Sequence, residues 1–513
     1  MLIKVQSAAI RGLDTIGVDV EVNVAAKGLP GFDIVGLADK AVDESRERVK
    51  TAILSSRIEF PQKKITINLA PADIPKEGSV YDLPIAVGLL SILTGCQAPP
   101  KSLFFGELSL DGSLRHTKGA LLMALFAKEA GFENVFAPKA SANEAAVISG
   151  IKVFPVENLR QLLNHFAGKQ LIDVALTPGV SPSTPGVYSE GEFNMAEVLG
   201  QEQAKRAMEI AAAGGHNILM VGSPGAGKTM LARALPGILP SLNEGESLEV
   251  TKIFSSAGRI PVGGSLIRVR QFRSPHHTTS PVGLIGGGTR PQPGEISLAH
   301  RGVLFLDEFN EFPRSVLEVL RQPLEDGFVT ISRSKEKTMY PARFMLVASA
   351  NPCPCGYLNH PKKNCICLPR QIKKYQKRVS GPLLDRIDLH IDVPPVEVNE
   401  LSGNQAASDF LEPSSAIRER VVSARKKQEE RFKDDALYVN AEMRNRHIKK
   451  YCQLSKEAEQ ILQQAGIKFQ LSARSYLKMI KIARTIADLA GAPEIEVSHM
   501  AEALQYRPKN YEE

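Results

Sequence analysis

The sequence predicts an α/β protein with a central parallel sheet covered by helices, followed by a mostly helical C-terminal part. Short, wholly apolar segments at 218–221, 303–306 and 344–348 alternate with helical stretches, as strands buried on both faces do. From Ser414 onward the chain is charged and helical in its spacing, and 472–490 is strongly amphipathic. The 43% hydrophobic and 23% charged residues exclude a disordered or fibrous protein.

Residues 1–170 are expected to form a separate α/β domain. Segments 18–24 and 65–69 alternate apolar and polar residues, which predicts half-buried strands. Segments 39–54 and 119–130 have the apolar spacing of helices. Interspersed elements of both kinds favour one mixed domain.

Proline, glycine and serine dominate the stretch after this domain, so we expect a linker at 171–192. A parallel-sheet core at 193–395, which includes the four-cysteine insertion, and a helical lid at 396–513 complete the predicted organisation. The N-terminus lacks a secretory apolar region, and no apolar run is long enough to span a bilayer. We therefore expect a cytoplasmic protein with reduced thiols and no membrane partner.

A glycine-rich loop follows the apolar strand at 218–221 and leads into a helix. It matches the pattern G-x-x-x-x-G-K-[ST] and consists of Gly222, Ser223, Pro224, Gly225, Ala226, Gly227, Lys228 and Thr229. Backbone N–H groups of such a loop surround phosphate oxygens, the lysine neutralises the β- and γ-phosphates, and the threonine hydroxyl binds Mg²⁺. The loop predicts an ATP site.

Asp307 and Glu308 follow the apolar strand at 303–306, about 80 residues after the loop. Carboxylates at the carboxyl end of a neighbouring strand suit the second half of a nucleotide triphosphate site. We expect Asp307 to support Mg²⁺ and Glu308 to activate the attacking water.

These two motifs together resemble those of an AAA+ ATPase. The resemblance implies that Asn351, after the strand at 344–348, contacts the γ-phosphate or the attacking water. It implies that Arg386, in the segment SGPLLDRID, reaches the γ-phosphate of a neighbouring subunit, and that Arg474 is the arginine of the lid. A residue supplied across a subunit interface requires a ring, and a homohexamer is the family expectation. Residues 198–201 resemble the segment that packs against adenine.

Longer strings resemble the ComM/YifB family of magnesium-chelatase-like ATPases. They include FRSPHHT from Phe272, PGEISLAH from Pro293, NPCPCG from Asn351 and GLPGFDIVGLA from Gly28. The resemblance covers nearly the whole chain. It implies an ATP-driven DNA helicase that promotes branch migration of DNA junctions and three-strand intermediates during natural transformation and recombination. Its partners would be single-stranded and branched DNA. The alternatives are a metal-insertion ATPase subunit like magnesium chelatase, or an AAA+ switch that remodels partners without translocating.

Residues 60–140 also resemble the fold of the Lon protease domain. Motif alignment puts its serine position near Val80 and its lysine position near Leu121, and neither side chain supports serine–lysine chemistry. Ser79 and Lys118 lie close to these positions, so a shifted pair is an alternative. We expect a non-catalytic domain rather than an active protease.

Four of the six cysteines lie within fifteen residues: Cys353, Cys355, Cys365 and Cys367. Four thiolates on a short loop suit a closed tetrahedral Zn²⁺ site. Free buried cysteines and a reactive dithiol are the alternatives, whereas Cys96 and Cys452 are expected to be packing residues. His276 and His277 are expected to hydrogen-bond within their loop rather than ligate metal.

The net charge of +7 is weak evidence for DNA, so local clusters matter more. The run 362–378 holds seven basic and no acidic residues, including Lys373 and Lys374, and is either a phosphate-binding segment or a solvated helix face. A second basic stretch spans 259–301. The resemblance implies pore loops formed by Leu284 and Ile285 at one tip, and by a hairpin that carries three basic residues. These are Arg333, Lys335 and Lys337.

Overall fold

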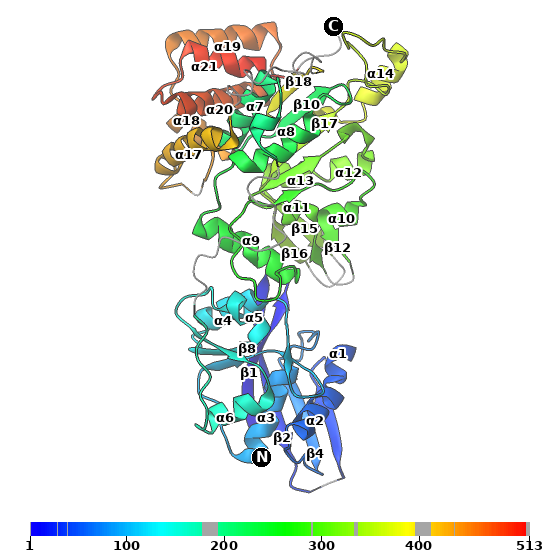
Figure 1. Ribbon diagram of the computed structural model, residues 1–513, viewed down its shortest axis with the longest axis vertical. Helices are drawn as coiled ribbons and strands as arrows, with labels where there is room; N and C mark the ends of the chain where they lie inside the picture. Colours follow the sequence, from blue (N-terminus) through cyan, green and yellow to red (C-terminus); the bar gives the residue numbers. More distant parts are fainter. Residues whose placement is uncertain are drawn as a thin grey trace. The chain divides into compact units, whose positions relative to one another are not determined.

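The computed structural model describes residues 2–27, 29–37, 39–176, 193–288, 291–332, 337–395, 412–435 and 437–508. It divides into two compact units, each assembled from separate stretches of the chain (Figure 1). Unit 1 comprises Met1–Pro185, Asn243–Arg268 and Ser332–Tyr340; unit 2 comprises Gly186–Leu242, Val269–Ile331 and Pro341–Glu513. The chain passes from one unit to the other at five points, near residues 185, 242, 268, 331 and 340. The predicted α/β fold class, with a parallel-sheet core and a helical C-terminal region, is confirmed.

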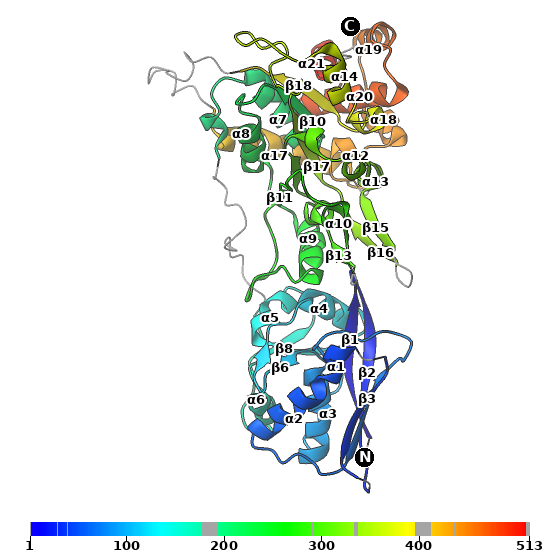
Figure 2. The same ribbon diagram turned by 90° about the vertical axis from the view of Figure 1, so that its right-hand side faces the viewer.

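Unit 1 is built on a seven-stranded sheet in the order β3-β4-β2-β1-β5-β8-β9. Its strands are β1 (Leu2–Arg11), β2 (Asp14–Val24), β3 (Gly31–Val35), β4 (Lys64–Ala70), β5 (Ser102–Phe104), β8 (Asn134–Pro138) and β9 (Lys152–Val156). β1 and β2 pair antiparallel along their whole lengths, as Figure 2 shows, whereas β5, β8 and β9 run parallel. The strands predicted at 18–24 and 65–69 lie within β2 and β4, which confirms them. A short hairpin joins β6 (Glu107–Leu108) and β7 (Leu114–Arg115).

The helices of unit 1 are α1 (Lys40–Asp43), α2 (Ser45–Ser55), α3 (Asp82–Thr94), α4 (Ala120–Glu129), α5 (Lys139–Ala145), α6 (Leu159–Phe166) and α9 (Glu244–Ser256). α3 packs closely on β1 and β2. The close approach requires glycine at residue 88, because an added Cβ would lie 2.4 Å from Cγ2 of Val22. The helix predicted at 119–130 is α4. The one predicted at 39–54 is interrupted at Glu44. Near this interruption, Nη2 of Arg48 donates to the carbonyl of Ala41 at 2.9 Å. The same guanidinium group pairs with the buried carboxylate of Asp82.

α9 belongs to unit 1 although it follows the phosphate loop in the sequence. The buried Glu144 of α5 accepts hydrogen bonds from the backbone N–H of Leu121 at 2.9 Å and from Oγ of Ser255 at 2.5 Å. Asn243 and Glu246 cap the start of α9 reciprocally. The predicted α/β domain at 1–170 therefore shares its unit with a segment from the middle of the chain.

Unit 2 contains a parallel five-stranded sheet in the order β11-β14-β17-β10-β18. The strands are β10 (Ile218–Gly222), β11 (Phe272–Arg273), β14 (Val303–Leu306), β17 (Met345–Ala350) and β18 (Leu389–Val393). The three predicted apolar strands are confirmed as β10, β14 and β17. Since all five strands run in one direction, the residues that follow them gather at one edge of the sheet.

Short helices and hairpins surround this sheet. They are η1 (Met195–Glu197), α7 (Glu202–Gly214), α8 (Lys228–Ala234), η2 (Leu235–Ile238), α10 (Pro281–Ile285), α11 (Glu295–Leu298), η3 (Phe309–Glu311), α12 (Arg314–Glu318), α13 (Arg321–Asp326), α14 (Pro369–Gln376) and α15 (Gly381–Leu384). β12 (Gly286–Gly287) pairs with β13 (Gln292–Pro293). β15 (Phe328–Ser332) pairs with β16 (Lys337–Pro341), and the chain passes from unit 2 to unit 1 near the end of β15. No helix in the described ranges combines the length and apolar character needed to cross a bilayer.

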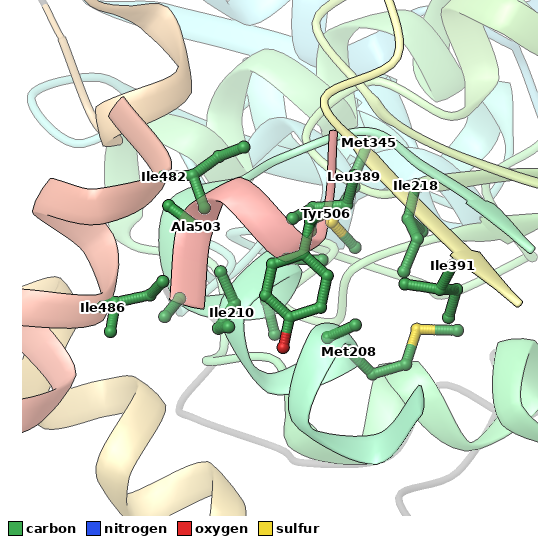
Figure 3. Packing of buried hydrophobic residues seen from close by; sticks show 14 of the residues in the cluster. Met208, Ile210, Ile218, Met345, Leu389, Ile391, Ile482, Ile486, Ala503 and Tyr506 are labelled. Atoms are coloured by element: carbon green, nitrogen blue, oxygen red, sulfur yellow. The ribbon is translucent and has the colours of Figure 1, made fainter. Parts of the chain in front are cut away.

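The C-terminal helices share one hydrophobic core with the parallel sheet. They are α17 (Ser414–Arg431), η5 (Asn440–Glu442), α18 (Asn445–Tyr451), α19 (Lys456–Lys468), α20 (Ala473–Ala490) and α21 (Val497–Gln505). Figure 3 shows Ile482 and Ile486 of α20 and Tyr506 after α21 beside Ile210 of α7 and the strand residue Leu389. The amphipathic stretch 472–490 is confirmed as α20, with Ser472 as its N-cap. The core–lid boundary at 395/396 remains a prediction, and it falls inside unit 2.

An acidic side chain at the end of α20 organises the helical region. Asp488 is buried and pairs with Arg484, which is also buried, and with Arg431 of α17. Its second oxygen accepts a hydrogen bond from Nδ2 of Asn440 at 2.8 Å. Buried charges of this kind are tolerated because each is paired.

Replacing Asp488 with alanine should destabilise unit 2 by about 3–5 kcal/mol, because the buried Arg484 and the half-buried Arg431 lose their counter-charge. Urea unfolding followed by circular dichroism measures the loss. The matched control is Lys101→Ala, which removes an exposed ion pair with Glu133 and should change stability little. Equal effects of the two substitutions would contradict the organising role of Asp488.

Candidate functional site

The glycine-rich loop connects β10 to α8, as the sequence predicts. Gly225 and Gly227 have φ angles of +80° and +87°, and an added Cβ at either position would meet no atom within 4 Å. Gly222 is confined instead by β18, because its Cβ would lie 2.2 Å from the carbonyl oxygen of Val393. Left-handed glycines let successive N–H groups point into one concave surface, which binds phosphate oxygens.

Lys228 lies at the start of α8 and is largely buried. Its Nζ donates to the carbonyls of Gly222 at 2.6 Å and Ser223 at 2.9 Å, and to Oδ1 of Asn351 at 3.2 Å. Burial lowers the pKa of Lys228, against the opposing charges of Asp307 and Glu308. The ammonium group of Lys228 therefore connects the phosphate loop to Asn351, the polar residue after β17.

Asp307 joins three elements at the carboxyl edge of the sheet. Oγ1 of Thr229 donates to its Oδ2 at 3.0 Å, and the hydroxyl of Ser349 donates to its Oδ1. A hydroxyl and a carboxylate oxygen at this separation are the ligand types that Mg²⁺ prefers, so Thr229 and Asp307 fit the predicted cation. The hydrogen bond from Ser349 was not anticipated from the sequence.

Glu308 has a left-handed backbone, with φ of +51°, and its N–H donates to Oδ1 of Asp307 at 3.0 Å. Its carboxylate lies 3.3 Å from Nδ1 of His277, and the rings of His276 and His277 are 4.1 Å apart. His277 follows β11, so it lies at the carboxyl edge that carries Glu308. The contact with Glu308 is a role for His277 that sequence reasoning missed, although the parallel strand order was the signal for it.

Arg386 and Arg474 converge on one acidic side chain. Arg474 at the start of α20 pairs with Oε1 of Glu325 at 3.2 Å, and Arg386 after α15 pairs with Oε2. The hydrogen bond from Arg386 keeps the pKa of Glu325 below its usual range. Glu325 at the end of α13 was not singled out in the sequence, because only the fold brings it to both arginines.

The segment at 198–201 lies beside the phosphate loop. Val198 is buried, and Gln201 has a φ of +61°. Its side-chain amide donates to the carbonyls of Ala226, at 3.4 Å, and Pro394. The structure thus connects this segment to both β18 and the loop.

The four clustered cysteines bring their sulfur atoms together. Sγ of Cys353 lies 3.4 Å from that of Cys355 and 3.7 Å from that of Cys365, and the last two are 3.6 Å apart. All four sulfur atoms, including that of Cys367, lie within 4.8 Å of one another. The donor set therefore fits a soft metal ion.

The residues predicted to contact DNA differ in how exposed they are. Leu284 was expected at an exposed loop tip, and this is wrong, because it is fully buried in α10. Ile285 ends that helix and is half-buried. Lys337, Lys373 and Lys374 are exposed, whereas Arg333 and Lys335 lie outside the described residues.

The basic stretch at 259–301 is not a continuous exposed strip. Arg273 forms a bidentate pair with Glu295, at 2.6 and 2.8 Å. Arg301 is buried, pairs with Glu442 at 3.1 Å and stacks on Tyr438. Glu442 lies far away in the sequence, so the local excess of positive charge was misleading.

In unit 1, the hydroxyl of Ser79 donates to Glu107. Lys118 lies beside Gly258, where an added Cβ would be 3.3 Å from the lysine Cβ. Val80 is half-buried, and Leu121 is buried in α4. The hydroxyl of Ser79 therefore bonds to a carboxylate rather than to Lys118, the lysine of the shifted pair.

Family models match three parts of the chain. They are described as magnesium chelatase subunit ChlI at residues 194–401, subunit ChlI of Mg-chelatase at 20–141, and the subunit ChlI C-terminal region at 411–507. The chain is 41% identical over 505 residues to competence protein ComM of Haemophilus influenzae, covering 98% of this chain and 97% of the relative. It is 42% identical over 508 residues to uncharacterized protein YifB of Salmonella typhimurium, covering 98% of this chain and 96% of the relative. It is 27% identical over 191 residues to the magnesium-chelatase 38 kDa subunit of Rhodobacter capsulatus, covering 34% of this chain and 54% of the relative.

His277→Ala should lower the rate of nucleotide hydrolysis up to about a hundredfold while leaving nucleotide affinity unchanged, because the carboxylate of Glu308 loses its positioning partner. Steady-state hydrolysis and equilibrium binding of a fluorescent nucleotide measure the two effects. His116→Ala is the control, because His116 belongs to unit 1 and the site belongs to unit 2. A loss of affinity with an unchanged turnover rate would contradict this role of His277.

Proposed function

The chain belongs to the ComM/YifB family of magnesium-chelatase-like AAA+ ATPases, and from this premise we propose that it is an ATP-driven DNA motor promoting branch migration. Family membership implies ATP and Mg²⁺ as its nucleotide and cation. The observation that carries the proposal is 41% identity to competence protein ComM along nearly the full length of both chains. It supports a competence-related protein, and natural transformation and recombination are the processes we propose for its action.

The residues at the sheet edge divide the hydrolysis between them. The glycine loop and Lys228 hold the phosphates, Thr229 and Asp307 hold the cation, and Glu308 accepts a proton from the attacking water. The cation neutralises charge that develops on the phosphate oxygens. Asn351 lies within 3.2 Å of Lys228 and is suited to orient the γ-phosphate or the water.

A homohexameric ring follows from the proposed role of Arg386. A residue that acts on a neighbour's nucleotide requires a head-to-tail interface, which forms a ring when its rotation closes, and six subunits are the family expectation. Arg386 is paired with Glu325 within this chain. In the proposed ring, the guanidinium reaches the adjacent nucleotide, and Arg474 acts on the nucleotide of its own subunit.

The exposed basic residues supply the proposed DNA contacts. Lys362, Lys363 and Arg370 are exposed together with Lys373 and Lys374, in a stretch without acidic residues. Lysine and arginine bind phosphates and release counterions, which gives affinity for single-stranded and branched DNA without a sequence preference. Lys337, with Arg333 and Lys335, adds the proposed pore hairpin.

A metal-insertion ATPase is the second candidate, because the family models are those of magnesium chelatase. The magnesium-chelatase relative covers only 34% of this chain, whereas ComM covers 98%. The nearly full-length similarity favours the DNA motor. A remodelling switch without translocation is the outcome if neither substrate stimulates hydrolysis.

We also propose that the four cysteines hold a structural Zn²⁺. A tetrahedral site with Zn–S bonds of ~2.3 Å has sulfur–sulfur edges of about 3.8 Å. The sulfur–sulfur distances among Cys353, Cys355 and Cys365 are 3.4, 3.7 and 3.6 Å. The N–H of Cys355 also donates to Sγ of Cys367 at 3.4 Å, as outer-shell donors to metal-bound thiolates do.

The motor is tested by measuring ATPase stimulation by single-stranded DNA together with strand movement on a three-strand junction. Both should be positive, and Glu308→Gln should abolish both while nucleotide binding persists. Intrinsic ATP hydrolysis without either DNA response would overturn the DNA motor.

Lys335→Ala combined with Lys337→Ala should weaken DNA binding. The slope of log K against log salt should fall by about 1.4 for single-stranded DNA, at about 0.7 for each lost phosphate contact. Lys456→Ala with Lys468→Ala removes the same charge from exposed positions on α19 and serves as the control. An unchanged slope in the first variant would remove the hairpin from the DNA interface.

Metal analysis of freshly purified, reduced protein should find about one zinc per chain, and Cys367→Ser should lose it. Cys96→Ser is the control, because Cys96 lies outside the cluster. Wild-type protein without zinc would exclude the site.

A further inference from the structure

We infer that the metal-bound cysteine segment braces the phosphate loop, so that occupancy of the metal site controls nucleotide affinity. The inference rests on the proposed zinc site and goes beyond it, since it assigns the metal a regulatory consequence at a second site. The contact that carries it lies between Gly356 and Pro224, within unit 2.

Gly356 forms the turn after the first two cysteines and presses directly against the phosphate loop. It is buried, with a φ of +80°, and its N–H donates to the carbonyl of Cys353 at 2.9 Å. A Cβ added to Gly356 would lie 2.5 Å from Cδ and 2.7 Å from Cγ of Pro224. A side chain therefore cannot be accommodated at residue 356 unless the turn or the phosphate loop moves.

A second contact connects the same two segments. Asn351, just before the cysteines, accepts a hydrogen bond from Lys228 at the other end of the phosphate loop. Residues 352–355 lie between these contacts, and the carbonyl of Pro352 accepts a hydrogen bond from Nε2 of Gln376 at 3.2 Å. The short stretch 351–356 thus touches the loop at its proline and at its lysine.

The cysteine segment is held by local turns and surface contacts rather than by regular secondary structure. It is described throughout, and it contains no helix or strand between the end of β17 at Ala350 and the start of α14 at Pro369. Ile366 and Leu368 are 84% and 65% exposed, so the segment does not build a hydrophobic core from them. Segments of this kind depend on a cross-link, and a metal that ties four thiolates together supplies the ordering free energy.

α14, the helix that follows the segment, is fixed at its C-terminal end to the turn after Glu308. Nη1 of Arg378, just after α14, donates to the carbonyl of Asn310 at 3.1 Å and pairs with Glu311 at 2.8 Å. The metal loop is therefore held between the phosphate loop and the turn after β14. Without the metal, the Gly356 turn is free to move away from Pro224, and the loop loses the support that keeps its N–H groups pre-arranged for phosphate.

The test measures zinc content and the Kd of a fluorescent ADP analogue with Mg²⁺ on the same full-length preparations. Cys367→Ser should lose zinc and bind the nucleotide about tenfold more weakly. Gly356→Ala should keep one zinc per chain, because all four thiolates remain, yet bind nucleotide more weakly to a similar degree. Cys96→Ser should match wild type in both measurements.

Adding Pro224→Ala to Gly356→Ala should recover part of the lost affinity, because it removes the Cγ and Cδ atoms that the new Cβ would meet. Chelation of wild-type protein, followed by return of Zn²⁺, should weaken and then restore binding. This arm needs no variant to fold. Circular dichroism of each preparation confirms that secondary structure is intact.

The outcomes separate the inference from the zinc proposal. Zinc-containing wild type whose affinity is unchanged by chelation and by Gly356→Ala would overturn the brace while leaving the metal site in place. Wild type without zinc would overturn both. Loss of affinity in Gly356→Ala without recovery in the double variant would also contradict the contact with Pro224.

Discussion

The carboxylate of Asp307 is the interaction on which the nucleotide site depends. It accepts hydrogen bonds from Thr229 of α8 and from Ser349 of β17, while it lies at the end of β14 itself. The strands β14 and β17 and the start of α8 are thereby held together at one edge of the parallel sheet. The position of Lys228, which reaches Asn351 across the same edge, follows from that alignment. Parallel strands make the arrangement possible because their carboxyl ends point in one direction.

Much of the fold and of the site was predictable because it is encoded locally. The strands β10, β14 and β17 are short apolar runs with turn residues beside them, and the glycine loop carries its own pattern. The proximity of the four cysteines was also visible, since a chain of fifteen residues readily brings their sulfur atoms together. In each case the side chains that matter are neighbours in the sequence or follow consecutive buried strands.

The remainder required the tertiary structure. Glu325 meets Arg386 and Arg474 across 61 and 149 residues, and no local pattern marks it. Leu284 was misplaced because glycines around an apolar residue suggest an exposed tip, whereas the packing of α10 against α11 and α12 buries it. The helix predicted at 39–54 is divided at Glu44, and Arg48 hydrogen-bonds both the carbonyl of Ala41 and the distant carboxylate of Asp82 there. Tertiary contacts that compete with local preference are invisible to periodicity.

The division of the chain into interleaved units limits how its parts can be separated genetically. A gene fragment that ends near residue 185 encodes the seven-stranded sheet but omits α9, so Glu144 loses the hydroxyl of Ser255 that it binds in the intact chain. Likewise, a fragment that begins there carries α9 without its partner helices. Exchange of the N-terminal part between relatives by a single crossover would therefore join mismatched surfaces. Inheritance of the two units as one block is the expected evolutionary consequence of five chain crossings.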